Sequence, residues 1–160
     1  MANSRHNSGV TLVEMLVVLG IIVVLSSIVV TLTLRVDNQS KENAVNNALT
    51  LASGALREYY EAKGQFPPQP ERNSANALAH VELMYQALRA EPASRQVLDK
   101  LSSAMVKSEG GAADLRAMYD PWGTPMDYIY APNETFPQLI SAGPDRQFGT
   151  GDDIVSKGRR

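Results

Sequence analysis

Residues 9–34 read GVTLVEMLVVLGIIVVLSSIVVTLTL, and this stretch decides the fold. As an α-helix, residues 10–34 would extend about 37 Å at ~1.5 Å per residue, enough to cross a hydrocarbon core of about 30 Å. Glu14 is the only charged residue in the stretch. A carboxylate in a helix of bilayer length is costly and is therefore a functional signal. The sequence predicts a transmembrane helix in which Glu14 has a functional role.

The residues that flank this helix predict its direction of insertion. The short leader before it contains Arg5 and His6, and Arg35 follows it. Basic residues on the short N-terminal side favour keeping that side in the cytoplasm. The long side chain of Arg35 can reach the interface at the far end of the span.

Two simpler interpretations of the apolar run compete with a functional assembly helix. A secretory signal peptide has an apolar core of only ~7–15 residues, followed by a cleavage site of small residues. This run is longer, and no Ala-x-Ala site follows it. A plain signal anchor fits the length but leaves Glu14 unexplained.

Composition limits what the rest of the chain can be. A length of 160 residues leaves room for one domain beyond the helix. The net charge of −2 gives no general attraction to nucleic acid, and the absence of cysteine excludes disulfides and thiolate metal sites. The sequence contains no recognisable Ser-His-Asp group, phosphate-binding glycine loop or histidine pair for zinc. We therefore expect a protein that is not an enzyme.

The helix is predicted to continue beyond the membrane over residues 35–64. Gly64 is a plausible C-terminal cap, and Pro67-Pro68 prevents further continuation. Apolar residues recur at the three-and-four spacing of one buried helical face, at Val45, Ala48, Leu49, Ala52, Ala55, Leu56, Tyr59 and Tyr60.

The middle segment, residues 65–117, is predicted to be helical and variable. Asn73 or Ser74 can cap a first helix, and Ser94 can cap a second. We expect His80 on the surface or on a helix face rather than as a ligand. The apolar stripes predicted to face the core are Leu78, Val81, Met84, Tyr85 and Leu88, then Val97, Leu98, Leu101 and Met105.

Residues 118–160 are predicted to form a small antiparallel sheet. A turn-forming stretch, DPWGTP at 120–125, precedes one strand at 126–131 and a second at 136–141. Three carboxylates then share a glycine-rich loop at 143–153, namely those of Asp145, Asp152 and Asp153. Such a loop can place oxygen ligands around a hard cation, although its spacing does not fit an EF-hand. The alternative is a solvated turn.

The N-terminal stretch resembles the prepilin signal of the type IV pilin and type II secretion pseudopilin superfamily. That signal combines a short polar leader (1–9 here), a cleavage site after glycine, and an apolar helix with Glu at its fifth position. The resemblance implies that a prepilin peptidase cuts between Gly9 and Val10 and methylates the new amine. It also implies that Glu14 acts in assembly. The family usually has Phe where Val10 stands, and a helix-bending proline where Thr31 stands, so this helix is expected to be straighter.

The C-terminal third, with its Asp-Pro-Trp-Gly turn, Tyr-rich strand and Asp/Gly loop, resembles the major pseudopilin of that superfamily. The resemblance implies an α+β fold, with a long N-terminal helix packed on a small antiparallel sheet. The predicted extra helices between them lie outside the resemblance. The resemblance also implies a structural calcium ion in the loop. Its ligands would be the side chains of Asp145, Thr150, Asp152 and Asp153 and backbone carbonyls near Ala142 and Ser156.

The function implied by this resemblance is that of a structural subunit of a type II secretion pseudopilus, anchored in the inner membrane with its C-terminal domain in the periplasm. Its expected partners are other copies of itself, the prepilin peptidase, the platform protein and minor pseudopilins of the secretion system, and no nucleic acid. A type IV pilus or competence pseudopilus subunit is the alternative within the superfamily. A membrane-anchored periplasmic binding module is the alternative from another class.

Overall fold

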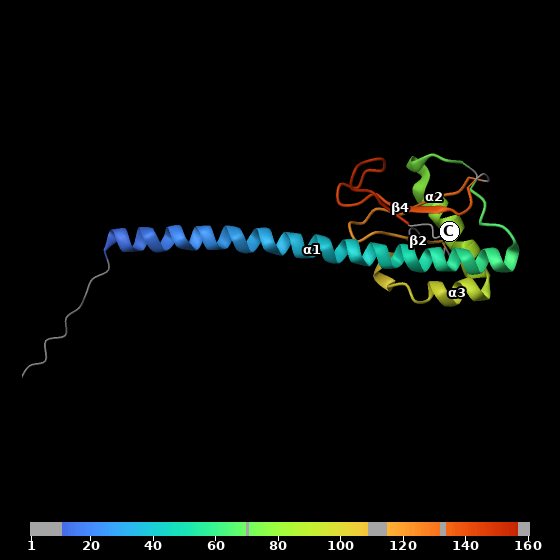
Figure 1. Ribbon diagram of the computed structural model, residues 1–160, viewed down its shortest axis with the longest axis horizontal. Coiled ribbons are helices and arrows are strands. Elements are labelled where there is room, and N and C mark those ends of the chain that lie inside the picture. Colours follow the sequence, from blue (N-terminus) through green and yellow to red (C-terminus); the bar gives the residue numbers. More distant parts are fainter. Residues whose placement is uncertain (1–10, 70, 109–114, 132–133, 157–160) are drawn as a thin grey trace, which may run out of the picture. The chain divides into compact units, whose positions relative to one another are not determined.

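The computed structural model describes residues 11–69, 71–108, 115–131 and 134–156, apart from the side chains of residues 30–35. The chain divides into two compact units, residues 1–38 and 39–160. One helix, α1 (Leu12–Lys63), contributes to both. Further helices and small antiparallel sheets follow it, so the predicted α+β class is confirmed (Figure 1).

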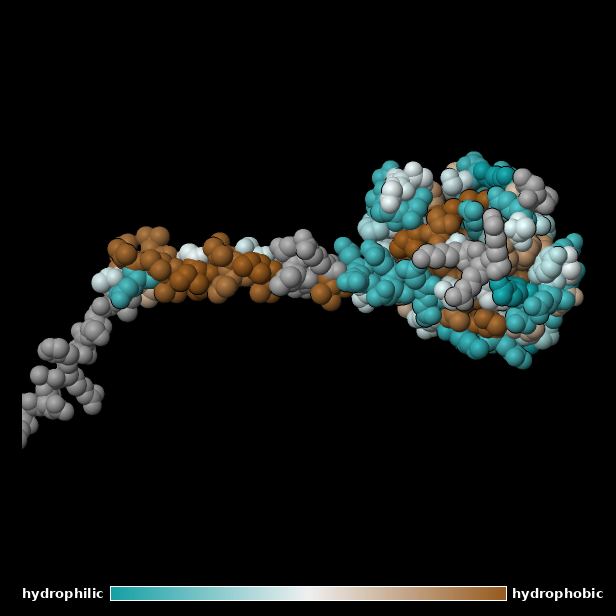
Figure 2. Space-filling view, viewed as in Figure 1, coloured by the Kyte–Doolittle hydropathy of each residue, from teal (hydrophilic) through white to brown (hydrophobic). Residues whose placement is uncertain are grey.

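Between Leu12 and Val29, α1 buries none of its large apolar side chains. Every large apolar residue from Leu12 to Val29 is at least 50 % exposed. Figure 2 shows these side chains as an almost uninterrupted hydrophobic surface along this part of the helix. A surface helix of a water-soluble domain shows an apolar stripe on one face instead. This segment is therefore suited to a lipid or protein environment.

In the second unit, α1 supplies one wall of the core. Its buried positions from Val45 to Leu56 follow the predicted spacing, whereas Tyr60, predicted for the same face, is exposed. The helix ends where the sequence indicates, because Gly64 adopts a positive φ of 71° and its N–H donates to the carbonyl of Tyr60 at 2.7 Å. Gly54 lies against α3, and a Cβ placed there would be 3.6 Å from Val97 Cγ1.

The middle segment contains helices α2 (Ala77–Ala90) and α3 (Pro92–Leu98). The 3₁₀ turn Ser74–Asn76 precedes α2 and is capped by Asn73, whose side chain accepts from Ala75 N–H at 3.1 Å. The predicted cap at Ser94 is wrong. Because Pro92 supplies the first turn of α3, Ser94 lies inside the helix and is buried.

The sheets are small and antiparallel. Strands β1 (Val106–Ser108) and β2 (Arg116–Met118) form an antiparallel pair at the end of the segment, residues 65–117, that was predicted to be helical. Strands β3 (Asp127–Ile129), β4 (Gln138–Ser141) and β5 (Ile154–Val155) form a second sheet in that order. A bridge between Tyr119 and Pro125 joins the two sheets at the DPWGTP turn.

Helix α2 packs on β2 and β3, and α3 packs on α2. Aromatic contacts close one end of this core, where Phe66 stacks on Tyr60 and meets Phe136 edge-on at 5.1 Å between ring centroids. The largest fully buried apolar side chains come from every layer: Leu56 of α1, Met84 and Leu88 of α2, Leu98 of α3, Met118 of β2, Tyr128 of β3 and Leu139 of β4.

Candidate assembly helix and acidic loop

The start of α1 is closed by a reciprocal pair of hydrogen bonds between Thr11 and Glu14. The backbone N–H of Thr11 donates to Glu14 Oε2 at 2.8 Å, and the backbone N–H of Glu14 donates to Thr11 Oγ1 at 3.2 Å. This is a capping box, in which two N–H groups that lack helical partners are satisfied. Glu14 therefore has a local role that the sequence analysis missed, although the Thr-x-x-Glu spacing is its signature.

The segment after this cap is long and apolar enough to cross a membrane. Residues Leu12–Val29 have a mean hydropathy of 2.8, and none of them is buried. Core helices of water-soluble proteins can be equally apolar, but they are mostly buried, whereas this helix is exposed. Glu14 is exposed beside the first turn, and its carboxylate remains open to a partner. Gly9 and Val10, the predicted processing site, lie outside the described residues.

The acidic loop connects β4 to β5, and its carboxylates bind backbone N–H groups. Asp145 Oδ1 accepts from Gln147 N at 2.8 Å, and Asp153 Oδ2 accepts from Gly149 N at 2.7 Å. Asp152 accepts from Asp145 N at 3.0 Å and from the Thr150 hydroxyl at 2.6 Å. These bonds, led by that of Thr150, hold the pKa of the Asp152 carboxyl below its ordinary value.

Gly143 closes the base of this loop by a very close backbone approach. Its φ is +66°, and a Cβ placed on it would lie 2.3 Å from the carbonyl oxygen of Asp152. Only glycine fits such a position. The two ends of the loop are thereby held together directly before β5.

The predicted calcium ligands before β5 lie in one loop, but their carboxylates do not converge, and Ser156 follows β5. No three His, Cys, Asp or Glu side chains within the described ranges lie close enough together to hold a metal ion. The Oδ1 atom of Asp153 is buried and has no hydrogen-bond partner there. At the other predicted positions, Ala142 is fully buried, and Ser156 bonds to β4 through its N–H and hydroxyl.

Comparison with known protein families finds a match in the N-terminal stretch. Residues 4–30 match the family described as a prokaryotic N-terminal methylation motif. The chain carries a prepilin-type signal. No curated protein and no solved structure matches it.

The prepilin-type signal lies in the first unit of the structure and explains its exposed apolar helix. It supports the pilin and pseudopilin superfamily and the processing by a prepilin peptidase that the superfamily shares. The capping box and the exposed apolar surface both lie inside the matched residues. Together with the single N-terminal apolar helix, the signal is consistent with a single-pass membrane anchor.

Two polar centres in the core were missed by the sequence analysis. His80 is only 2 % exposed and bonds to Asp127 of β3, so it does not lie on the surface. Asp120, 3 % exposed, accepts from the N–H groups of Trp122 and Thr124 within its own turn and from the hydroxyl of Ser141 at 2.8 Å. An Asp before Pro in a turn indicates such a cap, whereas no local pattern indicates the contact with β4.

The close approach at Gly143 predicts a measurable difference between two glycines of the loop. Gly143→Ala should lower the free energy of unfolding by about 3 kcal/mol, because it adds a backbone clash to the cost of a left-handed conformation. Gly149→Ala is the control, since its φ is +87° but its Cβ would meet nothing within 4 Å. Gly149→Ala should lower the free energy of unfolding by about 1 kcal/mol. Urea unfolding followed by the fluorescence of Trp122, the only tryptophan, measures both; equal losses would refute the clash.

Proposed function

We propose that this chain is a structural subunit of a type II secretion pseudopilus. It is made as a membrane-inserted precursor, cut between Gly9 and Val10 by a prepilin peptidase, and methylated on the new amine. Copies then assemble at the platform protein, with minor pseudopilins, into a periplasmic filament that drives protein export. The protein carries out no catalysis of its own.

One observation carries the proposal: an exposed apolar helix of membrane length begins with a carboxylate. After extraction from lipid, such a surface must be covered by other apolar helices, and copies of the same chain provide them. A carboxylate among packed apolar helices is costly unless a cation pairs with it. The new amine of Val10 on a neighbouring copy is that cation.

The C-terminal region supports a pseudopilus over the other filaments of the superfamily. The turn at Asp120 and the acidic loop, the two features that resemble the major pseudopilin, are joined through Ser141. Its hydroxyl donates to Asp120 and accepts from the N–H of Gly143 at 3.2 Å. The two features are thus parts of one hydrogen-bonded structure.

The experiment that tests this function is complementation in two hosts. The chain should restore protein export and form short filaments in a host that lacks its own major pseudopilin. It should not restore pili in a host that lacks its major pilin. The reverse result would assign the chain to pili. A processed chain that remains monomeric in both hosts would favour a membrane-anchored binding module.

We also propose that calcium binds the acidic loop. The buried Oδ1 of Asp153 has no hydrogen-bond partner among the described residues, and a cation would supply a positive one. Asp145, Asp152, Asp153 and the hydroxyl of Thr150 would hold the ion, and the backbone carbonyls of Ala142 and Ser156 are the further ligands that the resemblance implies. Calcium accepts six to eight such oxygens in flexible geometry. Its charge would draw together carboxylates that otherwise repel one another.

Calcium is expected to raise the melting temperature of the full-length chain in detergent. A ligand present at one hundred times its Kd stabilises the folded state by about 2.7 kcal/mol, which corresponds to roughly 10 °C for a domain of this size. A chelator should reverse the gain. Asp153→Asn should abolish most of it, because it removes the negative charge that the ion would neutralise beside the buried Oδ1.

The control for this measurement is Asp99→Asn, which removes an exposed carboxylate far from the loop in sequence and should keep the full gain. Melting curves that are identical with calcium and with chelator, and a calorimetric titration without heat, would leave the loop as a solvated turn.

A further inference from the structure

A pocket lined by two arginines lies where the end of α2 meets β1, β2 and the segment after α3. Arg89 is in the last turn of α2, and Arg116 begins β2. The pocket has a volume of about 360 Å³, and sites for small molecules usually have volumes of about 300–1,000 Å³. It is therefore large enough to hold a small molecule.

Both arginines are on faces of their elements that otherwise turn inward. Arg89 comes one helical turn after Tyr85, which is 4 % exposed, so these two side chains share a face of α2. Arg116 comes two residues before the fully buried Met118, so these two share a face of β2. Because α2 packs on β2, two positive charges meet at one pocket from two packed elements.

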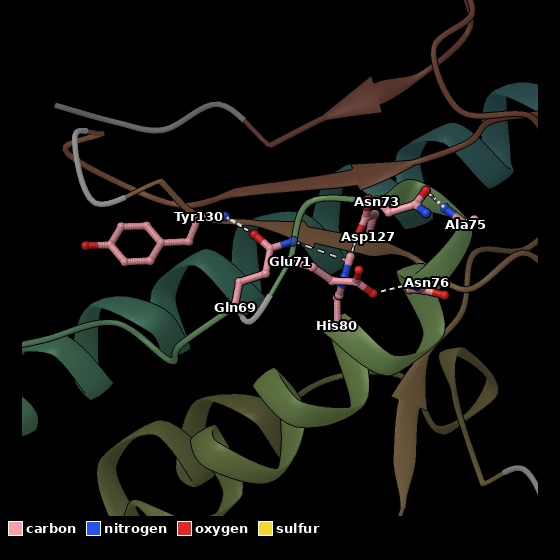
Figure 3. A network of polar contacts seen from close by, with 8 residues as sticks. All are labelled: Gln69, Glu71, Asn73, Ala75, Asn76, His80, Asp127 and Tyr130. Carbon is pink, nitrogen blue, oxygen red and sulfur yellow. Dashed lines mark hydrogen bonds and ion pairs between the residues drawn. The ribbon is translucent and has the colours of Figure 1, made fainter.

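Neither arginine forms an ion pair with a carboxylate of the described residues. Two other basic side chains of this unit do have such a partner. Lys63 Nζ lies 3.1 Å from Glu91 Oε2. His80, on the same helix as Arg89, has its Nδ1 2.8 Å from Asp127 Oδ1 (Figure 3). The helix dipole favours a positive charge at the end of α2, but it does not explain a second arginine across the pocket.

The other polar groups of the pocket leave its positive charge in excess. Ser103 and Ser108 contribute hydroxyl groups, and Ser108 lies directly opposite Arg116 in the register of β1 and β2. Asp99 is the one carboxylate among the described residues that line the pocket, and it forms no ion pair with either arginine. Two arginines against one aspartate leave a net charge of +1, so the pocket attracts an anion.

The remainder of the lining is apolar. Leu98 and Leu101 are only 2 % and 9 % exposed, and Val106 is half-buried beside them. A bare inorganic ion would leave these side chains without a contact. A ligand with an anionic group and an apolar body would satisfy both parts of the pocket.

We propose that this pocket binds a phosphate monoester, with its phosphate on Arg89 and Arg116 and its apolar body on Leu98 and Leu101. Guanidinium groups donate paired hydrogen bonds to phosphate oxygens. A phosphate monoester carries about −1.5 to −2 charges at neutral pH, which two arginines match better than the single charge of a carboxylate. The serine hydroxyls are further donors for its third oxygen.

Calorimetric titration of the full-length chain in a non-ionic detergent tests the site, with phenyl phosphate as the probe at low ionic strength. Arg89→Gln and Arg116→Gln should each weaken binding about tenfold, because each removes charge-assisted hydrogen bonds. Benzoate, which has the same ring but one charge, should bind more weakly than phenyl phosphate. Arg95→Gln is the matched control and should bind like the wild type, since Arg95 is an exposed arginine of α3 outside the pocket lining.

NMR locates the bound probe, whose ring protons should show contacts with the methyl groups of Leu98 and Leu101. Arg116 is exposed and Arg89 is partly exposed, so both variants should keep the melting temperature of the wild type. The titration of the wild type decides the case even if a variant does not fold, because absence of binding there would overturn the proposal.

Three further results would also overturn the phosphate site. An equal loss of binding in Arg95→Gln would indicate a general attraction to positive charge. Phenol binding as tightly as phenyl phosphate would indicate an apolar pocket. Glu109 and Asp114 lie outside the described residues, and binding that appears only after both are changed to amides would mean that the chain supplies its own anion. All these measurements use chains in detergent without filaments, so they are independent of the proposed function.

Discussion

A Gly9→Leu chain is expected to remain uncut in cells with an active prepilin peptidase. The peptidase must bring its reacting groups close to the backbone between residues 9 and 10, and glycine allows the closest approach. A branched side chain there would displace the bond. Since a misplacement of about 1 Å can slow a reaction roughly hundredfold, almost all copies should keep the precursor N-terminus. Mass spectrometry of the membrane fraction separates this form from wild-type chains that begin at Val10.

Gly20→Leu is the matched control for this prediction. Gly20 lies in the same apolar helix, and a Cβ placed there meets nothing within 4 Å. The same substitution at that position should be processed normally. Wild-type chains that retain Met1 while the host cuts its own prepilins would refute the processing step itself.

Replacing Glu14 is expected to reduce filament yield at least tenfold without preventing membrane insertion. An unpaired charge costs ~2.5–3.5 kcal/mol on insertion scales at the centre of a bilayer-spanning helix. Glu14 lies in the first turn, where the cost is smaller, and Glu14→Leu removes it, so this chain should insert readily. In the filament, the amine of Val10 would lose its partner. A loss of only about 1.4 kcal/mol per contact lowers the association constant about tenfold. Filaments sheared from cells and counted by immunoblot measure the loss.

The capping box allows the local role of Glu14 to be separated from its role in assembly. Glu14→Gln keeps a side chain that can cap the Thr11 N–H but removes the charge. If pairing between copies matters, Glu14→Gln should assemble as poorly as Glu14→Leu. If capping alone matters, Glu14→Gln should assemble like the wild type and the pairing role would be wrong.

Local patterns were enough to predict the helices and the class of the fold. The apolar spacing from Val45 to Leu56, the cap at Gly64 and the stripe of α2 each depend on neighbouring residues, and all are present. The β1–β2 pair was not anticipated. Its strands are three residues long, and Val106 pairs with Met118 across a gap that carries no strand signal.

The polar centres were unpredictable for a related reason. His80 and Asp127 are 47 residues apart, and nothing near either residue indicates the other. The capping box, in contrast, was present in the sequence as Thr-x-x-Glu. In a membrane-length helix, the same carboxylate also has a second explanation, pairing with a cation of another copy. The composition of the acidic loop predicts cation ligands, but its three aspartates mostly accept hydrogen bonds from backbone N–H groups.

The hydrogen bonds through Ser141 have an evolutionary consequence. The Asp120 carboxylate accepts hydrogen bonds from its own turn and from the Ser141 hydroxyl. That hydroxyl in turn accepts from the N–H of Gly143, the residue that closes the acidic loop. A homologue that replaces Asp120 by an apolar residue leaves this hydroxyl buried without an acceptor. Positions 120 and 141 should therefore covary among relatives, and lineages that lose the aspartate should carry alanine at 141.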